Sequence, residues 1–176
     1  MRRAAFLFLL LVVPASLGCA QSSSESAATG PSTPFEWPTF DEAVAAAKKS
    51  GKPILIDIYT PWCGWCRKMQ AEVYGDAATQ AYVMKHFEYG RLNIGDSETE
   101  HQFQGYVLTS EQLGYALGAQ GTPTTAFLEA NGDYITRLDG FWDLASFSKA
   151  VRYIGSEAYE NQSYEEFIEA STEAGN

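Results

Sequence analysis

A pair of cysteines separated by two residues constrains this chain more than any other feature. Cys63 and Cys66 lie in the sequence WCGWC at residues 62–66. The run Ile54–Tyr59 before them is apolar, β-branched and short enough for a buried strand, and a helical stretch follows to about Val73. Where such a pair opens a helix after a strand, two intervening residues bring the sulfurs within disulfide reach. The pattern therefore predicts a redox-active dithiol on the first turn of a helix.

Position on that helix distinguishes the two thiols. Cys63 would stand at the helix N-terminus, where unpaired backbone N–H groups and the helix dipole favour a thiolate, the species that attacks a disulfide. Cys66 lies one turn deeper, so we expect it to be less exposed and to resolve a mixed disulfide by attacking Cys63. Arg67 and Lys68 follow and add positive charge nearby. We therefore predict that Cys63 and Cys66 are catalytic and that Arg67 supports them.

Two other interpretations of the cysteine pair compete with redox chemistry. Half of a zinc site would need two further His or Cys ligands, but the sequence has no second C-x-x-C, and His86 and His101 are isolated. We expect these histidines at the surface or at helix ends, and we expect no metal. A purely structural disulfide would close so small a loop that it would constrain little of the chain. Redox chemistry is therefore the favoured interpretation.

Composition places the chain among globular proteins and narrows its partners. Its 176 residues suffice for one domain with a real core. There are 12 Lys+Arg against 22 Asp+Glu, a formal net charge of −10, and the acidic residues are scattered. Such a surface disfavours nucleic acid and anionic lipid as partners. The three cysteines comprise one close pair and Cys19, which is not the pattern of a disulfide framework.

The first 18 residues have the layout of a secretory signal peptide. Arg2 and Arg3 form a positively charged start, residues 4–13 are apolar, and Pro14 and small residues follow. The apolar stretch is too short for a permanent membrane-spanning helix. The sequence therefore predicts export, with residues 1–18 as the signal peptide.

Cys19 ends a sequence that resembles a bacterial lipobox. In SLGC at residues 16–19, Gly18 fits that motif, whereas Ser16 replaces the usual large aliphatic residue. The favoured interpretation is lipidation of Cys19, with residues 19–34, rich in Ser, Ala, Thr, Gly and Pro, as a flexible tether. The alternative is ordinary cleavage after Ala20, which would discard Cys19. We expect membrane contact only through this lipid anchor, in the periplasm or the outer cell envelope.

The rest of the chain is predicted to form one domain at residues 35–171, followed by a tail at 172–176. Its strands and helices alternate, which implies an α/β fold with a central mixed, mostly parallel sheet flanked by helices. The expected helices cover 40–50, 63–73, a stretch up to 86, 109–118, 144–154 and a stretch from 163, and capping boxes at Thr39 and Thr109 mark the starts of two of them. The expected strands cover 54–59, 87–94, 124–128 and 134–138, and an Asn131-Gly132 turn joins the last two.

Four landmarks make this domain resemble the thioredoxin superfamily over nearly its whole length. They are the WCGWC motif at 62–66, Asp57 six residues before Cys63, the segment Arg91-Leu92-Asn93 and the segment Gly121-Thr122-Pro123-Thr124. The first is the strongest alone, but all four follow in the order and at the spacing of that family. The resemblance implies a thioredoxin fold.

The resemblance also implies roles for residues outside the cysteine pair. Pro123 would form a cis-proline loop opposite Cys63, and the backbone of Thr122 would pair with a substrate strand. Asp57 would be a buried acid that accepts the proton of Cys66, since burial raises the pKa of a carboxyl group. Arg91 would pair with Asp57 and, being always charged, hold it ionised. The alternatives are a plain trans turn at Pro123, an acid at a strand end, and a solvated Arg91.

Aromatic residues near the motif suggest an apolar rim for partner proteins. Trp62, Gly64 and Trp65 are predicted to contact the substrate because the motif exposes them. Tyr59, Phe141 and Trp142 are weaker members of this rim, since aromatic residues are often core.

Two features depart from plain thioredoxin. Trp65 replaces the usual proline between the cysteines, so the reduction potential of the family does not carry over. Residues 95–113 form an insertion before the cis-proline loop, and the sequence from Gly140 onward suggests a short C-terminal helical extension. In this insertion and in its C-terminal end, the chain is similar to periplasmic thioredoxin-related proteins of the SoxW type.

Together these features predict a monomeric thiol–disulfide oxidoreductase of the cell envelope. Its partners would be disulfide-containing or dithiol proteins and an upstream redox donor, and it needs no dissolved cofactor. Gly64 and Trp65 add no charge between the cysteines, which favours the reducing side. The alternative is a non-catalytic binding module, a metallochaperone or a holdase, that uses the same groove.

Overall fold

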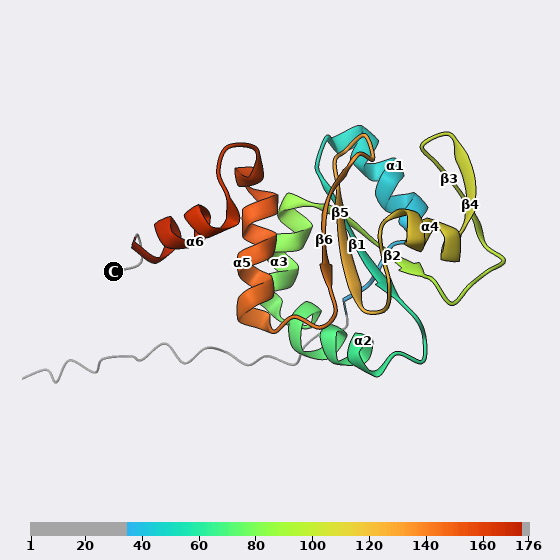
Figure 1. Cartoon of the computed structure of the whole chain (residues 1–176), viewed down its shortest axis with the longest axis horizontal. Helices are drawn as coiled ribbons and strands as arrows, with labels where there is room; N and C mark the ends of the chain where they lie inside the picture. Colours follow the sequence, from blue (N-terminus) through green and yellow to red (C-terminus); the bar gives the residue numbers. More distant parts are fainter. Residues whose placement is uncertain (1–34, 174–176) are drawn as a thin grey trace, which may run out of the picture. The chain divides into compact units, whose positions relative to one another are not determined.

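The computed structural model of the chain describes residues 35–173 (Figure 1). The predicted signal peptide, the tether and Cys19 lie outside the described residues, as does the end of the predicted tail at 174–176. Among the described residues, no helix is both long enough and apolar enough to cross a membrane.

A mixed four-stranded sheet forms the centre of the domain, with strand order β2-β1-β5-β6. Its strands are β1 (Ile54–Tyr59), β2 (Glu88–Asn93), β5 (Thr124–Leu128) and β6 (Tyr134–Asp139). The pairing of β1 with β2 is parallel, whereas β5 pairs antiparallel with both β1 and β6, so two of the three pairings in this sheet are antiparallel. The mixed sheet is thus confirmed, but the expectation that it is mostly parallel is wrong. A helical crossover returns β2 parallel to β1, whereas the chain before β5 re-enters the sheet from the opposite end.

Strand β1 lies inside the sheet, between β2 and β5, and all of its residues except the last are buried. Its residues alternate between the two faces of the sheet. Ile54, Ile56 and Ile58 pack with residues of α1 (Phe40–Ser50) and α4 (Ser110–Ala116). Leu55 packs on the opposite face, with residues of the helices after β1. The same alternation turns Asp57 toward those helices.

Three helical segments and α5 cover the Leu55 face. After β1 the chain forms α2 (Gly64–Met69), a π-helix η1 (Gln70–Tyr74) and α3 (Ala77–His86), and α5 (Leu144–Gly155) follows β6. Both predicted capping boxes are present: Thr39 opens α1 and Thr109 opens α4. These helices begin where the capping side chains accept backbone N–H groups that have no partner within the helix.

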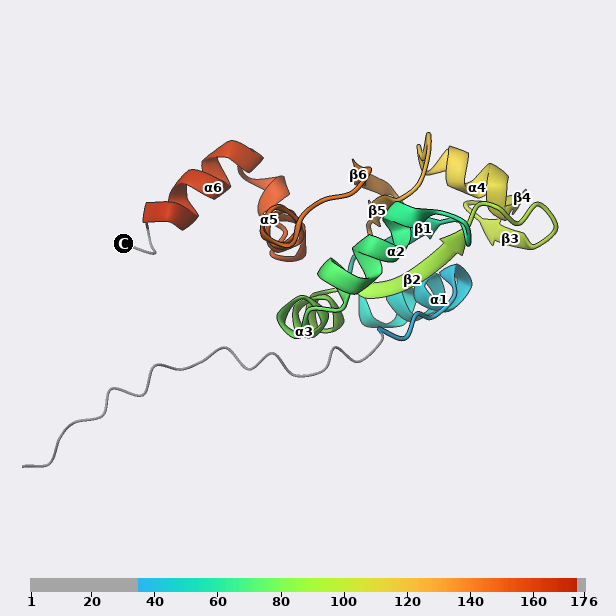
Figure 2. The ribbon, with the colours of Figure 1, turned by 90° about the horizontal axis from the view of Figure 1, so that it is seen from below.

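The segment before the cis-proline loop contains a second sheet that the sequence pattern did not predict. Strands β3 (Glu100–Phe103) and β4 (Tyr106–Thr109) pair antiparallel, and Figures 1 and 2 show them beside α4. The turn uses left-handed backbone at Gln104 and Gly105, with φ of 51° and 83°. The strands were missed because they are short and their polar residues show no clear alternation.

His101 on β3 corrects a second expectation. It is buried rather than at the surface or a helix end, with only 6% of its surface exposed. Its Nδ1 lies 2.9 Å from Asp41 Oδ2 of α1, and its Nε2 lies 2.8 Å from Ser110 Oγ of α4. These two contacts fasten the hairpin to α1 and α4. His86, by contrast, ends α3 as expected.

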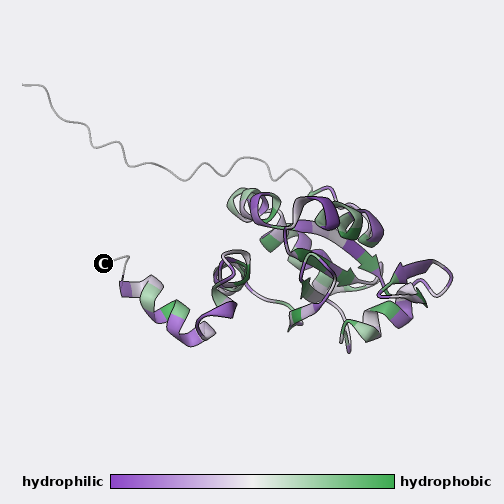
Figure 3. Cartoon of the chain, turned by 90° about the horizontal axis from the view of Figure 1, so that it is seen from above, coloured by the Kyte–Doolittle hydropathy of each residue, from purple (hydrophilic) through white to green (hydrophobic). Residues whose placement is uncertain are grey.

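The C-terminal extension consists of η2 (Ala158–Glu160) and α6 (Tyr164–Glu173). The ring of Tyr153 on α5 lies 5.4 Å from both the Tyr164 and the Phe167 rings, measured between ring centroids. Helix α6 buries none of its residues and continues past the predicted domain end at 171. Hydrophilic and hydrophobic residues alternate along it, whereas hydrophobic residues gather on the strands of the central sheet (Figure 3).

Candidate active site

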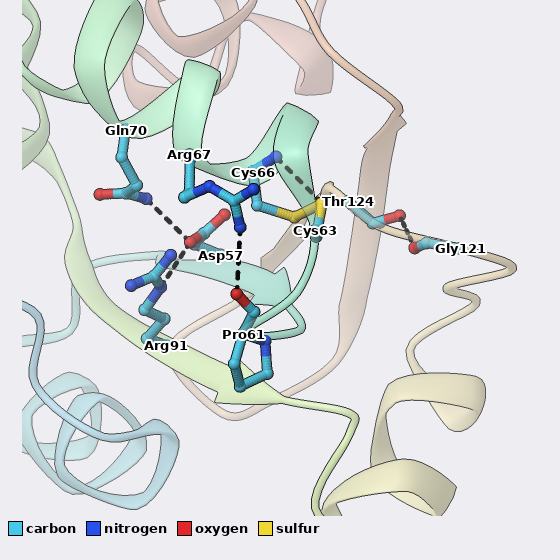
Figure 4. Close-up of a disulfide and its surroundings, with 9 residues drawn as sticks. All are labelled: Asp57, Pro61, Cys63, Cys66, Arg67, Gln70, Arg91, Gly121 and Thr124. Atoms are coloured by element: carbon cyan, nitrogen blue, oxygen red, sulfur yellow. Dashed lines mark hydrogen bonds and ion pairs between the residues drawn. A yellow bond between two sulfur atoms is a disulfide. The ribbon is translucent and has the colours of Figure 1, made fainter.

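Cys63 and Cys66 form a disulfide where the loop after β1 enters α2 (Figure 4). Cys63 is the N-cap residue of α2, and its Sγ accepts a hydrogen bond from the backbone N–H of Cys66 at 3.0 Å. The same N–H would stabilise negative charge on this sulfur in the reduced protein. The helix start therefore favours a thiolate at Cys63.

The two sulfurs differ in their access to a partner. Cys66 exposes only 2% of its surface, whereas Cys63 is half-buried. The tryptophans that flank Cys63 in the motif, Trp62 and Trp65, are 71% and 59% exposed. A disulfide of another protein therefore meets Cys63 and an aromatic surface before it meets Cys66.

Both cations after the motif have partners other than the two sulfurs. Arg67 donates from Nη1 to the carbonyl oxygen of Pro61 at 3.2 Å. The ammonium of Lys68 lies 5.1 Å from the centre of the Trp65 ring and 4.7 Å from that of Phe141. Arg67 is thus held by a carbonyl oxygen at the cavity that Cys66 also lines, and Lys68 lies over aromatic rings.

The predicted rim is only partly continuous. The Trp65 and Phe141 rings are 5.5 Å apart between centroids, and Phe141 and Trp142 are half-buried against the core. Tyr59 instead stacks under the guanidinium of Arg91 at 3.7 Å. Trp62 and Trp65 are thus the exposed members, and Tyr59 belongs to the interior side of the site.

Asp57 on β1 lies on the Cys66 side of the disulfide (Figure 4) and is 1% exposed. Its Oδ2 accepts hydrogen bonds from Arg91 Nε at 2.7 Å and from Gln70 Nε2 at 3.0 Å. Its Oδ1 is buried without a hydrogen-bond partner, and Figure 4 shows this oxygen on the side of the carboxyl group that faces Cys66. The carboxyl group is thus anchored through one oxygen and free at the other.

The environment of Asp57 makes it a weak acid. Burial raises its pKa from 3.8 to about 6, although the charge of Arg91 and the hydrogen bonds from Arg91 and Gln70 lower it. Arg91 therefore forms the expected ion pair, but it does not restore an ordinary pKa to Asp57, because the loss of hydration outweighs the attraction. A carboxyl group with this pKa exchanges its proton near neutral pH.

Gln70 is a residue of the site that the sequence analysis missed. It opens η1, four residues after Cys66 and therefore on the same side of the helical segment. Its Oε1 accepts a hydrogen bond from the indole N–H of Trp37 at 2.8 Å. An open cavity of about 480 Å³ adjoins these groups and is also lined by Cys66 and Arg91. The four-residue spacing was the signal that could have identified Gln70.

The cis-proline loop lies at the same edge of the sheet as the disulfide. The peptide bond between Thr122 and Pro123 is cis. Thr124, the first residue of β5, pairs with Ile58 near the end of β1, so the loop before β5 and the loop after β1 lie together. Thr124 Oγ1 donates to the Gly121 carbonyl oxygen at 2.9 Å, which closes the loop (Figure 4). Thr122 is half-buried beside the buried Pro123.

A metal centre has no candidate ligands in the part of the chain that the structure describes. Within residues 35–173, no three or more His, Cys, Asp or Glu side chains are grouped so that they could hold a metal ion.

Comparison with known proteins places this fold and site in a class. Residues 40–155 match the family of the thioredoxin-like domain. The disulfide bond reductase DsbH of Chlamydia pneumoniae is 28% identical over 137 residues, which cover 74% of this chain and 80% of that protein. The thiol:disulfide interchange protein DsbD 1 of Pseudomonas aeruginosa is 34% identical over 165 residues, or 83% of this chain and 26% of that protein. The chain thus spans about a quarter of the length of such longer relatives.

A solved structure shows the same fold. A thioredoxin-fold protein from Helicobacter pylori superposes with a TM-score of 0.62 at 21% identity, over 70% of this chain and 86% of that one. A four-stranded mixed sheet flanked by helices, with a C-x-x-C disulfide at a helix start, is the arrangement of a thioredoxin-like domain. The chain belongs to the thioredoxin-like domain family. The predicted thioredoxin fold is confirmed.

The raised pKa of Asp57 predicts a pH dependence of stability. Because the pKa is 3.8 without burial and about 6 in the folded protein, the folded protein binds this proton more tightly than the unfolded chain. The contribution of Asp57 to the free energy of unfolding is therefore greatest below about pH 4 and falls as the pH rises to about pH 6. The replacement Asp57→Asn removes this loss, so it should gain about 3 kcal/mol relative to the wild type between pH 4 and pH 7.

Urea unfolding of the two oxidised proteins at both pH values measures this gain. A difference between wild type and Asp57→Asn that stays constant with pH would show that burial does not raise the pKa of Asp57.

Proposed function

We propose that this chain is an exported thiol–disulfide oxidoreductase that reduces disulfides of partner proteins in the cell envelope. The observation that carries the proposal is the asymmetry of the cysteine pair. Cys63 is half-buried and accepts a hydrogen bond from a backbone N–H, whereas Cys66 is buried on the side of the disulfide where Asp57, a carboxyl group with a raised pKa, lies (Figure 4). This is the arrangement that a nucleophile and a resolving thiol need.

The reaction begins from the reduced pair. The Cys63 thiolate attacks one sulfur of the partner disulfide, that S–S bond breaks, and the other partner sulfur leaves as a thiolate. Cys66 then gives its proton to Asp57 and attacks Cys63 Sγ. The Cys63–Cys66 disulfide forms and the partner is released as a dithiol, reduced by two electrons. A dithiol protein upstream returns both electrons to the pair.

The surface around Cys63 fits a substrate that binds through its backbone. Thr122 at the cis-proline loop offers backbone groups to an extended segment, and Trp62, Gly64 and Trp65 provide contact area on the other side. Main-chain pairing gives affinity with little sequence selection, which suits an enzyme that acts on several disulfide proteins. We expect the domain to act as a monomer.

Several features support the reducing direction. Gly64 and Trp65 add no charge between the cysteines, and Arg67 and Lys68 are engaged by a carbonyl and by aromatic rings. A thiolate at Cys63 is then stabilised less than in a strong oxidant, which keeps the potential low. The chlamydial relative is named a disulfide bond reductase. We also propose that the chain is related to periplasmic thioredoxin-related proteins of the SoxW type.

The roles of the cysteines predict different outcomes for their serine variants. Cys66→Ser should accumulate mixed disulfides with partner proteins because the resolving thiol is missing, whereas Cys63→Ser should not. Both variants should abolish insulin reduction. Non-reducing gels of each variant after exposure to a disulfide protein measure trapping. Equal trapping by both variants, or faster alkylation of Cys66 than of Cys63 in the reduced wild type, would refute the assignment.

The reduction potential tests the direction. We expect a value near that of thioredoxin, about −270 mV, from equilibration with glutathione or dithiothreitol buffers. Trp65→His, which places a donor and a partial charge between the cysteines, should raise it. A wild-type value above about −150 mV, close to that of a strong oxidant, would overturn the reducing direction.

Lipidation at Cys19 is the proposed basis for the location. Mass spectrometry of the protein from membranes of an expressing bacterium should show an N-terminus at a Cys19 that carries acyl chains, and Cys19→Ala should release the domain into the soluble periplasmic fraction. An unmodified N-terminus at Gln21 would refute the anchor and leave the redox chemistry unaffected.

A further inference from the structure

Gln70 holds Asp57 in a way that the cysteine motif does not account for. We propose that Gln70, oriented by Trp37, is a positioning residue that keeps Asp57 Oδ2 occupied and so directs the proton of Cys66 to Oδ1. The inference rests on the proposed role of Asp57 as the proton acceptor. It goes beyond that role by assigning a function to Gln70 and by specifying Oδ1, rather than Oδ2, as the oxygen that accepts the proton.

The hydrogen bonds around the carboxyl group are unequally shared. Gln70 Nε2 and Arg91 Nε both donate to Oδ2, at 3.0 Å and 2.7 Å, from η1 and β2 respectively. Oδ1 is equally buried and has no partner. A proton on Oδ2 would displace at least one of the two donors, which costs free energy in a buried site. A proton on Oδ1 displaces nothing, and Oδ1 is the oxygen on the Cys66 side (Figure 4).

Trp37 determines which end of the Gln70 amide faces Asp57. An indole N–H donates only, so it requires the amide oxygen, and it lies 2.8 Å from Gln70 Oε1. The NH₂ group is then left for Asp57. A flipped amide would set its oxygen against the carboxylate and its NH₂ against the indole N–H, and both hydrogen bonds would be lost.

Aromatic packing keeps Trp37 in place. Its ring meets the rings of Phe35, Tyr74 and Tyr89 edge-on, with centroids 4.7, 4.8 and 5.9 Å away. Tyr74 is fully buried in the core. The segment before α1 therefore fixes the orientation of the Gln70 side chain, which lies 33 residues further along the chain.

A glutamine suits this position because its amide does not titrate. It donates to Asp57 at every pH and adds no second acid beside Cys66. The pair Cys66 and Asp57 then shares a single proton, which passes from Sγ to Oδ1 and on to solvent. The cavity lined by Trp37, Cys66 and Gln70 is a route by which water reaches the site.

The experiment separates attack from resolution. Reduced protein is mixed in a stopped-flow instrument with dithiobisnitrobenzoate, a chromogenic disulfide. The first release of nitrothiobenzoate reports attack by Cys63, and the second reports displacement by Cys66. In the wild type, the second phase should accelerate as the pH rises through about 6, the pKa of Asp57.

Two variants test Gln70 and its orientation. Gln70→Met keeps the length of the side chain but cannot donate, so the midpoint of the second phase should move to higher pH and its rate near neutral pH should fall about threefold or more. Trp37→Phe keeps an aromatic ring but removes the indole N–H, and should shift the midpoint in the same direction by less than Gln70→Met does. The first phase should keep its rate in both.

Controls separate this inference from the proposed function. Gln102→Met makes the same substitution on the exposed part of β3 and should leave both phases unchanged. If Asp57→Asn leaves the second phase unaltered, the proposed role of Asp57 fails and the inference fails with it. If Asp57→Asn slows the second phase but Gln70→Met retains the wild-type pH profile, only the inference fails. Equal slowing of both phases by Gln70→Met would show a merely structural role and would also overturn it.

Discussion

The burial of the Asp57 carboxyl group is the constraint around which this domain is organised. A carboxyl group with 1% exposure loses its hydration, and isolated buried charge is among the costliest features a fold can contain. The structure compensates with Arg91 from β2 and Gln70 from η1. These contacts join the central strand, its parallel neighbour and the helix after the disulfide at one point. The residual cost appears as the raised pKa, which is also what makes the group chemically useful.

The site was more predictable from the sequence than the fold was, for a physical reason. Cys63, Cys66 and Asp57 lie within ten residues of each other on a strand and a helix whose types local patterns indicate. The direction of β5 depends on the end at which the chain re-enters the central sheet after the β3–β4 hairpin. No local sequence pattern predicts that end. Gln70 was missed because its partner, Trp37, is distant in sequence and approaches only in the folded chain.

The disulfide divides the site into two environments with different demands. On the outer side, Trp62 and Trp65 remain exposed, although exposed large aromatic residues are costly for solubility. On the inner side, Cys66 and Asp57 are almost fully buried, and Asp57 Oδ2 accepts hydrogen bonds from Gln70 and Arg91. The four-residue step from Cys66 to Gln70, at the change from α-helix to π-helix, connects these environments. Such π-helical turns often occur at functional positions.

The fastening of the β3–β4 hairpin has a consequence for how the domain tolerates substitution. His101 is buried and contacts Asp41 of α1 through Nδ1 and Ser110 of α4 through Nε2. One side chain of β3 therefore supplies a polar contact to two helices at once. Its replacement by an apolar residue would remove both contacts and leave the hydroxyl of Ser110, a residue with 3% exposure, buried without this partner. The attachment of the hairpin that distinguishes this domain from a plain four-stranded one is thus concentrated in a single residue.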